Sequence, residues 1–231
     1  REAYGNALVK LGKNNDLIVV TDAEVKNSTH ALKFMKEKPD RYFESYIMEQ
    51  NMIGLALGLS VKGFHLFAST FASFLSRAHD QIRMAALSSA NFTICGSYVG
   101  ISIGADGASQ MALEDLAMVR ALPESIVFYP SDAVSTEKIV ESCVNLKGIK
   151  YIRATRANTP VIYNNTESFP VGEFKVLKSS KKDKAVLVGA GITLHECLKA
   201  ANNLEANGLN VAVVDCYCIK PFDSSKFKEL V

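Results

Sequence analysis

Short runs of β-branched and aromatic residues alternate along this chain with segments of helical periodicity. The expected strands lie at 17–22, 65–69, 92–97, 125–130 and 149–153. The expected helices lie at 48–61, 70–88, 109–121 and 133–146, the last of them capped by Ser131 or Asp132. Strands alternating with helices of this length build parallel βαβ units, in which ligands bind beyond the carboxyl ends of the strands. We therefore expect an α/β fold, a three-layer sandwich around a mainly parallel sheet.

The alternation lapses after this unit and then resumes. Prolines, paired asparagines and a run of lysines occupy 157–183, which indicates a connection between domains. A second α/β unit follows, with "KAVLVGAG" as a strand, "ITLHECLKAANNLEANG" as a helix and "LNVAVVDCY" as a strand. One such turn is too short to close a core alone. We therefore predict a domain at 1–165, a linker at 166–183 and a truncated domain at 184–231; the start at Arg1 also predicts a fragment.

The composition argues against several classes of protein. A chain of 231 residues with 48% hydrophobic residues, 22% charged residues and a formal charge of +2 is typical of a soluble globular protein without a polyanion-binding face. We expect no nucleic-acid partner. No apolar run reaches the ~18 residues that a membrane span needs, so no membrane partner is expected. The five scattered cysteines, Cys216 and Cys218 among them, indicate reduced thiols rather than a metal site, and hence a cytoplasmic protein.

One segment of the second unit imitates a dinucleotide-binding fingerprint. The stretch "VLVGAGITL" is followed by Asp215 on the next expected strand. The third glycine of the fingerprint is replaced by Leu194, which would crowd the helix against the strand. We interpret the segment as an ordinary strand-to-helix turn.

Three segments of the first unit could carry chemistry. Glu49 opens an apolar helix, although the helix dipole alone would favour a carboxylate there. Phe71 and Phe74 lie three residues apart, so their rings should share one helix face; core packing is the alternative. Asp106 and Gln110 lie at the end of a glycine-rich segment, "CGSYVGISIGADGASQMALEDLAM". Such a loop lets the backbone approach a ligand, although a flexible surface loop also fits.

A resemblance joins these segments. It is carried by "AYGNAL", "EQNMIGLALGL", "STFASF", "RAHDQIRMAA", "GISIGADGASQMALEDLAMVRALP" and "PSDAVSTEKIV". Together they resemble the pyrimidine-binding domain of transketolases, and the segment after about 184 is similar to the start of that family's carboxy-terminal domain. The resemblance implies a thiamine-diphosphate-binding fold of the pyrimidine type. It also implies transfer of a two-carbon ketol unit from a ketose phosphate to an aldose phosphate.

The resemblance also implies roles for residues near the cofactor. The glutamate that matches Glu49 bonds N1′ of the cofactor's aminopyrimidine and promotes loss of the proton from C2 of the thiazolium. The apolar run behind Glu49 would supply the pocket that removes water from its carboxyl group. Phe74 matches the ring that stacks on the pyrimidine, with Phe71 shaping the same pocket. Gln110 matches a cofactor contact.

Other matched positions imply contacts with the sugar phosphate. Asp106 matches a residue that contacts substrate hydroxyls. Arg1, Ser28 and Arg156 match residues that hold the phosphate, for which a guanidinium fork is well suited. Tyr98 stands where the family usually has a histidine that contacts the substrate, so Tyr98 is also expected to bind substrate.

The sequence departs from the family pattern in further places. Ala105 stands where "GEDG" is usual, and Glu24 stands where an aspartate is expected. The family holds the diphosphate through magnesium or calcium bound by a G-D-G…N motif in an amino-terminal domain. The "GADG" at 104–107 is not that motif, because no asparagine follows at suitable spacing. We therefore expect no metal ligand in this chain.

These features lead to expectations about partners and activity. We expect an amino-terminal diphosphate-binding domain, on the same or a separate chain, and an isolated fragment that is inactive. A homodimer is expected because the family builds each site between subunits. Two alternatives stay open: a β-type subunit of a 2-oxo-acid dehydrogenase, which shares the fold, and a catalytically silent transketolase-like binding subunit, which Tyr98 favours.

Overall fold

The principal sheet has seven strands in the order β10-β5-β6-β4-β3-β1-β2. The computed structural model describes residues 1–230. The strands of this sheet are β1 (Ile18–Asp22), β2 (Tyr42–Glu44), β3 (His65–Phe71), β4 (Phe92–Ser97), β5 (Ile126–Phe128), β6 (Ile149–Ala154) and β10 (Cys218–Lys220). Neighbouring strands pair in parallel, except β10, which is antiparallel to β5. The predicted α/β fold with a mainly parallel sheet is confirmed.

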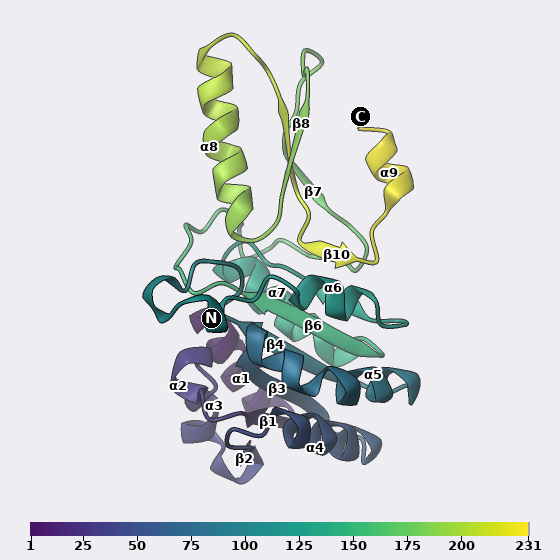
Figure 1. The fold of residues 1–231 in the computed structure, drawn as a ribbon. Helices are drawn as coiled ribbons and strands as arrows, with labels where there is room; N and C mark the ends of the chain where they lie inside the picture. The colour runs from purple at the N-terminus through teal and green to yellow at the C-terminus, as the bar shows by residue number, and fades with distance from the viewer. Residues whose placement is uncertain (231) are drawn as a thin grey trace.

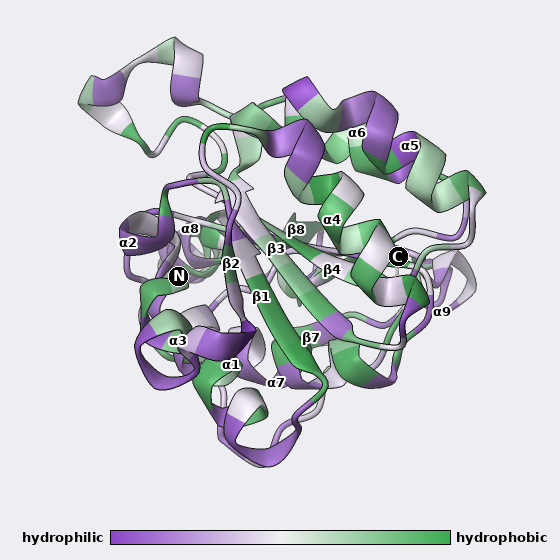
Figure 2. Ribbon diagram, turned by 90° about the horizontal axis from the view of Figure 1, so that it is seen from below, coloured by the Kyte–Doolittle hydropathy of each residue, from purple (hydrophilic) through white to green (hydrophobic). Residues whose placement is uncertain are grey.

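Helices cover both faces of this sheet, which gives the three layers (Figure 2). One face carries α1 (Glu2–Asn14), α3 (Leu32–Glu37) and α7 (Ala133–Ser142), and the other carries α4 (Glu49–Val61), α5 (His79–Leu87) and α6 (Asp115–Arg120). Every residue of β1, β4 and β6 is buried, because a parallel sheet covered on both faces exposes neither. The remaining short elements are the helix α2 (Lys26–Thr29) and the 3₁₀-helices η1 (Pro39–Arg41), η2 (Ala72–Ala78), η3 (Gly104–Asp106), η4 (Ala108–Gln110) and η5 (Cys143–Asn145).

Asp132, one of the two caps expected from the sequence, is the N-cap of α7. Its carboxylate accepts a hydrogen bond from the Ser135 backbone N–H at 2.7 Å. The Asp132 backbone N–H in turn donates to the Ser135 hydroxyl at 3.0 Å, which completes a capping box.

Two helices expected from the sequence are shorter in the structure. The segment 70–88 begins as the end of β3, because Thr70 and Phe71 pair with β4, and it continues as η2 before α5 begins at His79. The segment 109–121 begins with η4 and an extended stretch, since Gly100 N–H donates to Ala112 O at 2.8 Å. In both places a bond to a distant strand or loop overrides the local helical pattern.

The first helix, α1, was not expected from the sequence. Its N-cap residue, Arg1, makes no side-chain capping bond, so the usual start signal is missing. The apolar residues Tyr4, Leu8 and Leu11 nevertheless recur at helical spacing and pack into the core. That periodicity was available in the sequence.

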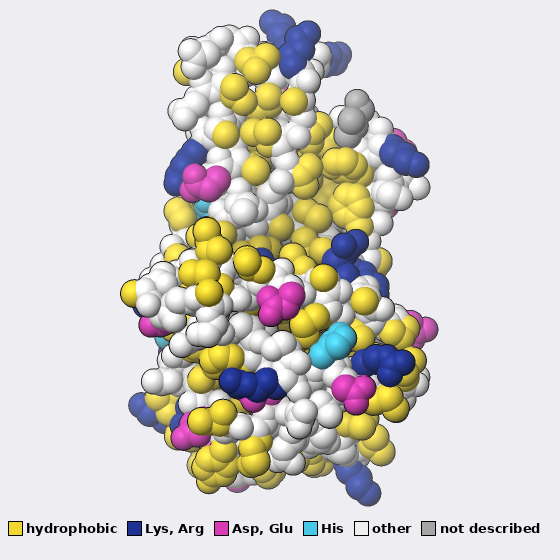
Figure 3. All heavy atoms as spheres, in the orientation of Figure 1, with side chains coloured by type: hydrophobic (Ala, Val, Ile, Leu, Met, Phe, Trp, Pro, Cys, Tyr) yellow, Lys and Arg dark blue, Asp and Glu magenta, His cyan; other side chains and the backbone are white. Residues whose placement is uncertain are grey.

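The second unit is a three-stranded sheet in the order β7-β9-β8, covered by a long helix (Figure 1). Its elements are β7 (Lys175–Lys178), β8 (Val186–Gly189), α8 (Ile192–Ala206), β9 (Ala212–Asp215) and α9 (Ser224–Lys228). Strand β7 lies inside the segment expected to be a linker. Strand β10 leaves this unit and joins the principal sheet beside β5. Hydrophobic side chains gather between α8 and α9, over the strands of this unit (Figure 3).

A buried carboxylate fastens the second unit to the first. Asp215 is fully buried and accepts hydrogen bonds from the Ser131 hydroxyl at 2.8 Å and the Tyr163 hydroxyl at 2.6 Å. The turn that imitates a dinucleotide fingerprint presses on the first unit as well. Gly191 has a φ of 55°, and a Cβ at this position would lie 2.0 Å from the Tyr129 ring. Asp215 and this turn are therefore committed to packing between the two units.

None of the helices in residues 1–230 is both long and apolar enough to span a membrane.

Replacing Asp215 with Asn should change how stability depends on pH. Burial raises the pKa of Asp215 to about 6, above its ordinary value of 3.8, although both hydroxyl donors oppose this rise. Because the folded state binds the proton more tightly than the unfolded state, the native chain gains stability as pH falls from about 6 to about 4 and loses it as pH rises. Each pKa unit corresponds to ~1.4 kcal/mol. Between about pH 4 and pH 7, the free energy of unfolding of the native chain should therefore fall by up to about 3 kcal/mol relative to Asp215→Asn.

Denaturant unfolding at several pH values measures this difference. Asp40→Asn, which removes an exposed carboxyl group, is the matched control and should run parallel to the native chain. A difference between the native chain and Asp215→Asn that stays constant with pH would contradict the prediction.

Candidate functional site

Most of the residues with predicted roles lie at one edge of the principal sheet, where its parallel strands end. Phe71 is the last residue of β3, Tyr98 directly follows β4, and Arg156 comes shortly after β6. Arg1 precedes α1, and Glu49 is the first residue of α4. Because α4 leads into β3 and packs beside it, the start of α4 lies near the carboxyl end of the strands.

The Glu49 carboxyl group is buried, and an arginine reaches it from the surface. Arg77 Nη1 donates to Glu49 Oε1 at 2.7 Å; the Glu49 side chain is 2% exposed and that of Arg77 is 51% exposed. Gln50 Nε2 donates to the Arg77 backbone carbonyl at 3.0 Å, which joins η2 to the first turn of α4. A buried carboxylate without a partner is strongly unfavourable. Arg77 therefore compensates a charge that folding removes from water.

The rings of Phe71 and Phe74 stack, but the prediction that they share a helix face is wrong. Phe71 ends a strand and Phe74 lies in η2; their centroids are 5.2 Å apart with an interplanar angle of 22°. Tyr98 stacks on Phe71 with a centroid distance of 4.2 Å. The guanidinium carbon of Arg77 lies 4.6 Å from the Phe74 centroid. A continuous row of contacts thus runs from Arg77 to Tyr98.

Arg1 joins the other residues expected to hold a sugar phosphate. Its Nη1 donates to the Tyr98 hydroxyl at 3.0 Å and to the Ser28 carbonyl at 2.5 Å, and its Nη2 donates to the Arg156 carbonyl at 2.9 Å. Its guanidinium carbon lies 4.5 Å from the Tyr98 centroid. Arg156 Nη1 donates to the Ile103 carbonyl. The structure therefore places Arg1, Ser28, Tyr98 and Arg156 together.

A buried aspartate shapes the turn that carries Ser28. Asp22, the last residue of β1, accepts hydrogen bonds from the Thr29 hydroxyl at 2.6 Å and the Val25 N–H at 2.7 Å. Burial raises the pKa of Asp22 to about 7, although these two donors oppose the rise. Glu24 lies in the same turn, is exposed and has a φ of 63°. The turn thus depends on a carboxyl group that sequence reasoning did not single out.

Asp106 and Gln110 lie on the glycine-rich loop after β4, in η3 and η4. Among the hydrogen bonds within residues 1–230, none involves either side chain, and Ala105 and Asp106 are exposed. The loop is attached through Ile103, which is fully buried against the aromatic row. The segment η4, which carries Gln110, packs next to η2, which carries Phe74.

A second buried ion pair, which sequence reasoning missed, holds the far end of this loop. Arg153 Nε donates to Asp115 Oδ2 at 2.8 Å, and Arg153 Nη2 donates to the Ala112 carbonyl at 3.1 Å. The Tyr151 hydroxyl also donates to Asp115, at 2.7 Å. An arginine inside the apolar strand "IKYIRA" was a signal for such a buried partner. Arg77 gave no comparable signal, because it lies among polar residues in "LSRAHDQ" and its side chain is half exposed.

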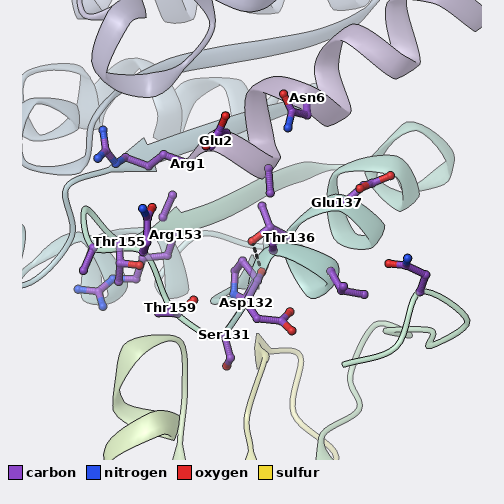
Figure 4. Close-up of a pocket in the computed structure, with 18 residues that line it drawn as sticks. Arg1, Glu2, Asn6, Ser131, Asp132, Thr136, Glu137, Arg153, Thr155 and Thr159 are labelled. Carbon is purple, nitrogen blue, oxygen red and sulfur yellow. Dashed lines mark hydrogen bonds between the residues drawn. The ribbon is translucent and has the colours of Figure 1, made fainter. Parts of the chain in front are cut away.

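A cleft of about 410 Å³, which Arg1 also lines, lies between the starts of α1 and α7 and the segment after β6 (Figure 4). Two of its charged side chains already have partners. Asp132 caps α7, and Arg153 binds Asp115. We assign no ligand to this cleft. Residues 1–230 also contain no group of three or more His, Cys, Asp or Glu side chains that could hold a metal ion.

Known proteins share both the sequence and the fold. The profile of the transketolase pyrimidine-binding domain matches residues 1–161, and that of the transketolase C-terminal domain matches residues 172–231. Transketolase of Homo sapiens is 54% identical over 224 residues, which are 96% of this chain and 36% of the human protein. Transketolase-like protein 2 of Mus musculus is 52% identical over 225 residues, 97% of this chain and 36% of the mouse protein.

A solved structure agrees with these matches. It is a split-gene transketolase described as an inactive β4 tetramer; it is 40% identical, has a TM-score of 0.89 and covers 100% of this chain and 75% of its own. The chain spans only 36% of the length of the human and mouse relatives named above. Since the pyrimidine-binding profile alone matches more than half of the chain, the chain belongs to the transketolase family.

Proposed function

We propose that this chain is the pyrimidine-binding half of a transketolase that transfers a two-carbon ketol unit from a ketose phosphate to an aldose phosphate, using thiamine diphosphate. The observation that carries the proposal is the buried Glu49 carboxyl group, which Arg77 joins to the stacked rings of Phe71 and Phe74. A carboxyl group next to an aromatic face fits an aminopyrimidine, whose ring nitrogen can share a proton and whose face can stack.

The chain's own residues would bind and orient the cofactor. When bound, thiamine diphosphate supplies the carbanion chemistry needed to break and form carbon–carbon bonds. Glu49 would hold a proton against N1′ of the aminopyrimidine, in a pocket from which folding excludes water. Phe74 would stack on the pyrimidine with Phe71 supporting it, and Gln110, on the neighbouring η4, would add a polar contact.

The arginines beside Tyr98 would hold the phosphate end of the sugar. Arg1 and Arg156 bring two guanidinium groups near the Tyr98 ring, at 4.5 and 5.7 Å from its centroid. Together with Ser28 they would form an anion site, and Tyr98 would contact the substrate. Asp106 would bind sugar hydroxyls from the exposed loop. Support comes from the convergence of Arg1, Ser28, Tyr98 and Arg156 in the fold.

The other half of the site would come from an amino-terminal domain on the same or a separate chain. That domain would hold the diphosphate through magnesium or calcium. The family relationship and the 36% coverage of human transketolase support this arrangement. The solved relative is described as a split-gene enzyme and as inactive, which supports both a separate chain and an inactive isolated half.

We also propose a homodimer that works in the cytoplasm, in the pentose phosphate pathway. Apolar side chains are exposed just before α4: Tyr46 by 59%, Ile47 by 70% and Met48 by 47%. Such clusters favour burial against a partner, and sedimentation of the assembled enzyme would show the dimer. The five cysteines are all free, which supports a reducing compartment.

A catalytically silent, transketolase-like binding subunit is a second candidate, and Tyr98 favours it. The Tyr98 hydroxyl already occupies a guanidinium donor of Arg1 that a phosphate would use. A β-type subunit of a 2-oxo-acid dehydrogenase is less favoured, since the relatives described above are transketolases.

The isolated chain should neither turn over sugar phosphates nor bind thiamine diphosphate tightly. The physical reason is that the ligands of the diphosphate and its metal are proposed to lie in the amino-terminal domain, which the isolated chain does not include. Titration calorimetry with magnesium and thiamine diphosphate measures this directly. Binding at micromolar or tighter Kd by the chain alone would contradict the proposed division of the site.

Glu49→Gln, made in the assembled enzyme, should lower kcat by at least about 100-fold while changing the unfolding free energy little, since positioned proton transfer contributes about 10²–10⁴-fold. An amide can hydrogen-bond N1′ but cannot hold the proton there. Steady-state kinetics at saturating cofactor measure the effect. The matched control is Glu196→Gln, an exposed glutamate on α8, which should keep normal turnover. Near-normal turnover of Glu49→Gln would refute the role of Glu49.

Tyr98→His distinguishes the two candidate functions. A phenol offers one hydroxyl and stays neutral near pH 7, whereas an imidazole offers two ring nitrogens and can carry a proton. We expect the substitution to raise ketol transfer by about 5- to 150-fold, the equivalent of one substrate hydrogen bond of about 1–3 kcal/mol. Exchange of the cofactor C2 proton, followed by NMR, should not change. Unchanged or lower transfer would mean that Tyr98 is adapted to its substrate, and the silent-subunit candidate would lose its main support.

A further inference from the structure

Arg77 contacts both of the side chains that would bind the cofactor's pyrimidine most directly. It donates to the Glu49 carboxylate at 2.7 Å, and its guanidinium carbon lies 4.6 Å from the centroid of the Phe74 ring. One contact is an ion pair and the other is a cation–π contact, and both depend on the position of the same guanidinium group. Arg77 thus makes the same two kinds of contact that an aminopyrimidine would make.

The chemical likeness between the two groups is close. A guanidinium group is planar, presents N–H donors in its own plane and stacks on aromatic faces. An aminopyrimidine is also planar, bonds a carboxyl group through its edge and stacks through its face. The Arg77 side chain is half exposed, and with Glu49 and Gln50 it lines an open depression at the start of α4. It can therefore swing into solvent without unfolding any element.

We propose that Arg77 is a positioning residue that occupies the pyrimidine's place until the cofactor binds. In the cofactor-free chain it keeps Glu49 paired and fixed in orientation. When the pyrimidine arrives, the guanidinium group leaves both contacts, and Glu49 exchanges a cationic partner for N1′. The proposal rests on the proposed role of Glu49.

This arrangement has an energetic consequence. A carboxylate that is buried alone would be strongly unfavourable, so Arg77 supports the folded pocket. The same ion pair must be broken before the cofactor can bind, which lowers cofactor affinity. Because Arg77 is half exposed, solvent screens the pair, and its effect on affinity should be modest.

The first test is cofactor affinity in the assembled enzyme, measured by calorimetry with thiamine diphosphate and magnesium. Arg77→Met should lower the cofactor Kd by about 3- to 10-fold. Arg77→Lys should have a smaller effect, because an ammonium group keeps the charge but lacks the planar fork. Arg83→Met removes an exposed arginine from α5 and is the matched control, with an unchanged Kd. An unchanged or higher Kd for Arg77→Met would overturn the proposal.

A double-mutant comparison separates this proposal from the role of Glu49. With Glu49→Gln in place, adding Arg77→Met should change the Kd by less than about 2-fold, because the ion pair is already gone. An equal effect of Arg77→Met in both backgrounds would overturn the proposal even if Glu49→Gln abolished turnover. Normal turnover of Glu49→Gln would instead reject the proposed function.

A second readout needs neither cofactor nor activity. In the chain alone, the guanidinium N–H signals of Arg77 should be protected from exchange with water in ¹⁵N-edited NMR spectra. Glu49→Gln should remove this protection while leaving the signals of Arg153 unchanged, since Arg153 is buried against Asp115. In the assembled enzyme, adding thiamine diphosphate with magnesium should also remove it. Protection of Arg77 that survives both changes would overturn the proposal.

Discussion

The contact of Phe71 with Tyr98 joins the two parts of the candidate site, and both residues owe their places to one strand pairing. Strand β3 pairs with β4 so that Phe71 lies opposite Ser97, the residue just before Tyr98. The two rings then stack at a centroid distance of 4.2 Å. Phe74 extends the row toward Glu49, and Arg1 extends it toward Ser28 and Arg156. A slip in this register would move Phe71 to the opposite face of the sheet and separate the two parts.

Charges around this row are satisfied by the protein itself. Arg77 lies over one ring and binds a carboxylate, whereas Arg1 lies over another and donates to a hydroxyl and two carbonyls. A pocket built this way holds its side chains in place before any ligand arrives. A ligand must therefore replace existing contacts, and its affinity reflects the difference between the old contacts and the new ones. This balance applies equally at Glu49 and at Tyr98.

The second unit is fastened to the first by polar contacts as well as by strand pairing. Lys220, at the end of β10, donates to the Arg120 carbonyl and the Ser125 hydroxyl, both at 3.0 Å. Asp215 accepts from Ser131, which lies directly before the cap of α7. The same α7 packs against α1, whose preceding residue, Arg1, belongs to the candidate site. The packing of the second unit is thus linked through buried groups to the position of Arg1.

The sequence alone determined the elements whose signals are local. The strands β1 and β4, the helix α4 and the capped start of α7 all follow from runs of residues that need no distant partner. Composition and periodicity likewise predicted the α/β class. The resemblance to a family supplied the proposed roles of Glu49, Phe74, Arg1 and Arg156, none of which could be derived from spacing.

Only the tertiary structure decided how these elements and side chains meet. Local pattern placed Phe71 on a helix, but hydrogen bonds to β4 keep it in a strand. The sequence did not show that strand β10 joins the principal sheet, because its partner, β5, lies far away in the sequence. The pairing of Arg77 with Glu49 was invisible for the same reason. A sequence records each residue's own preferences within a few neighbours, whereas strand register, burial and ion pairing depend on residues that only the folded chain brings together.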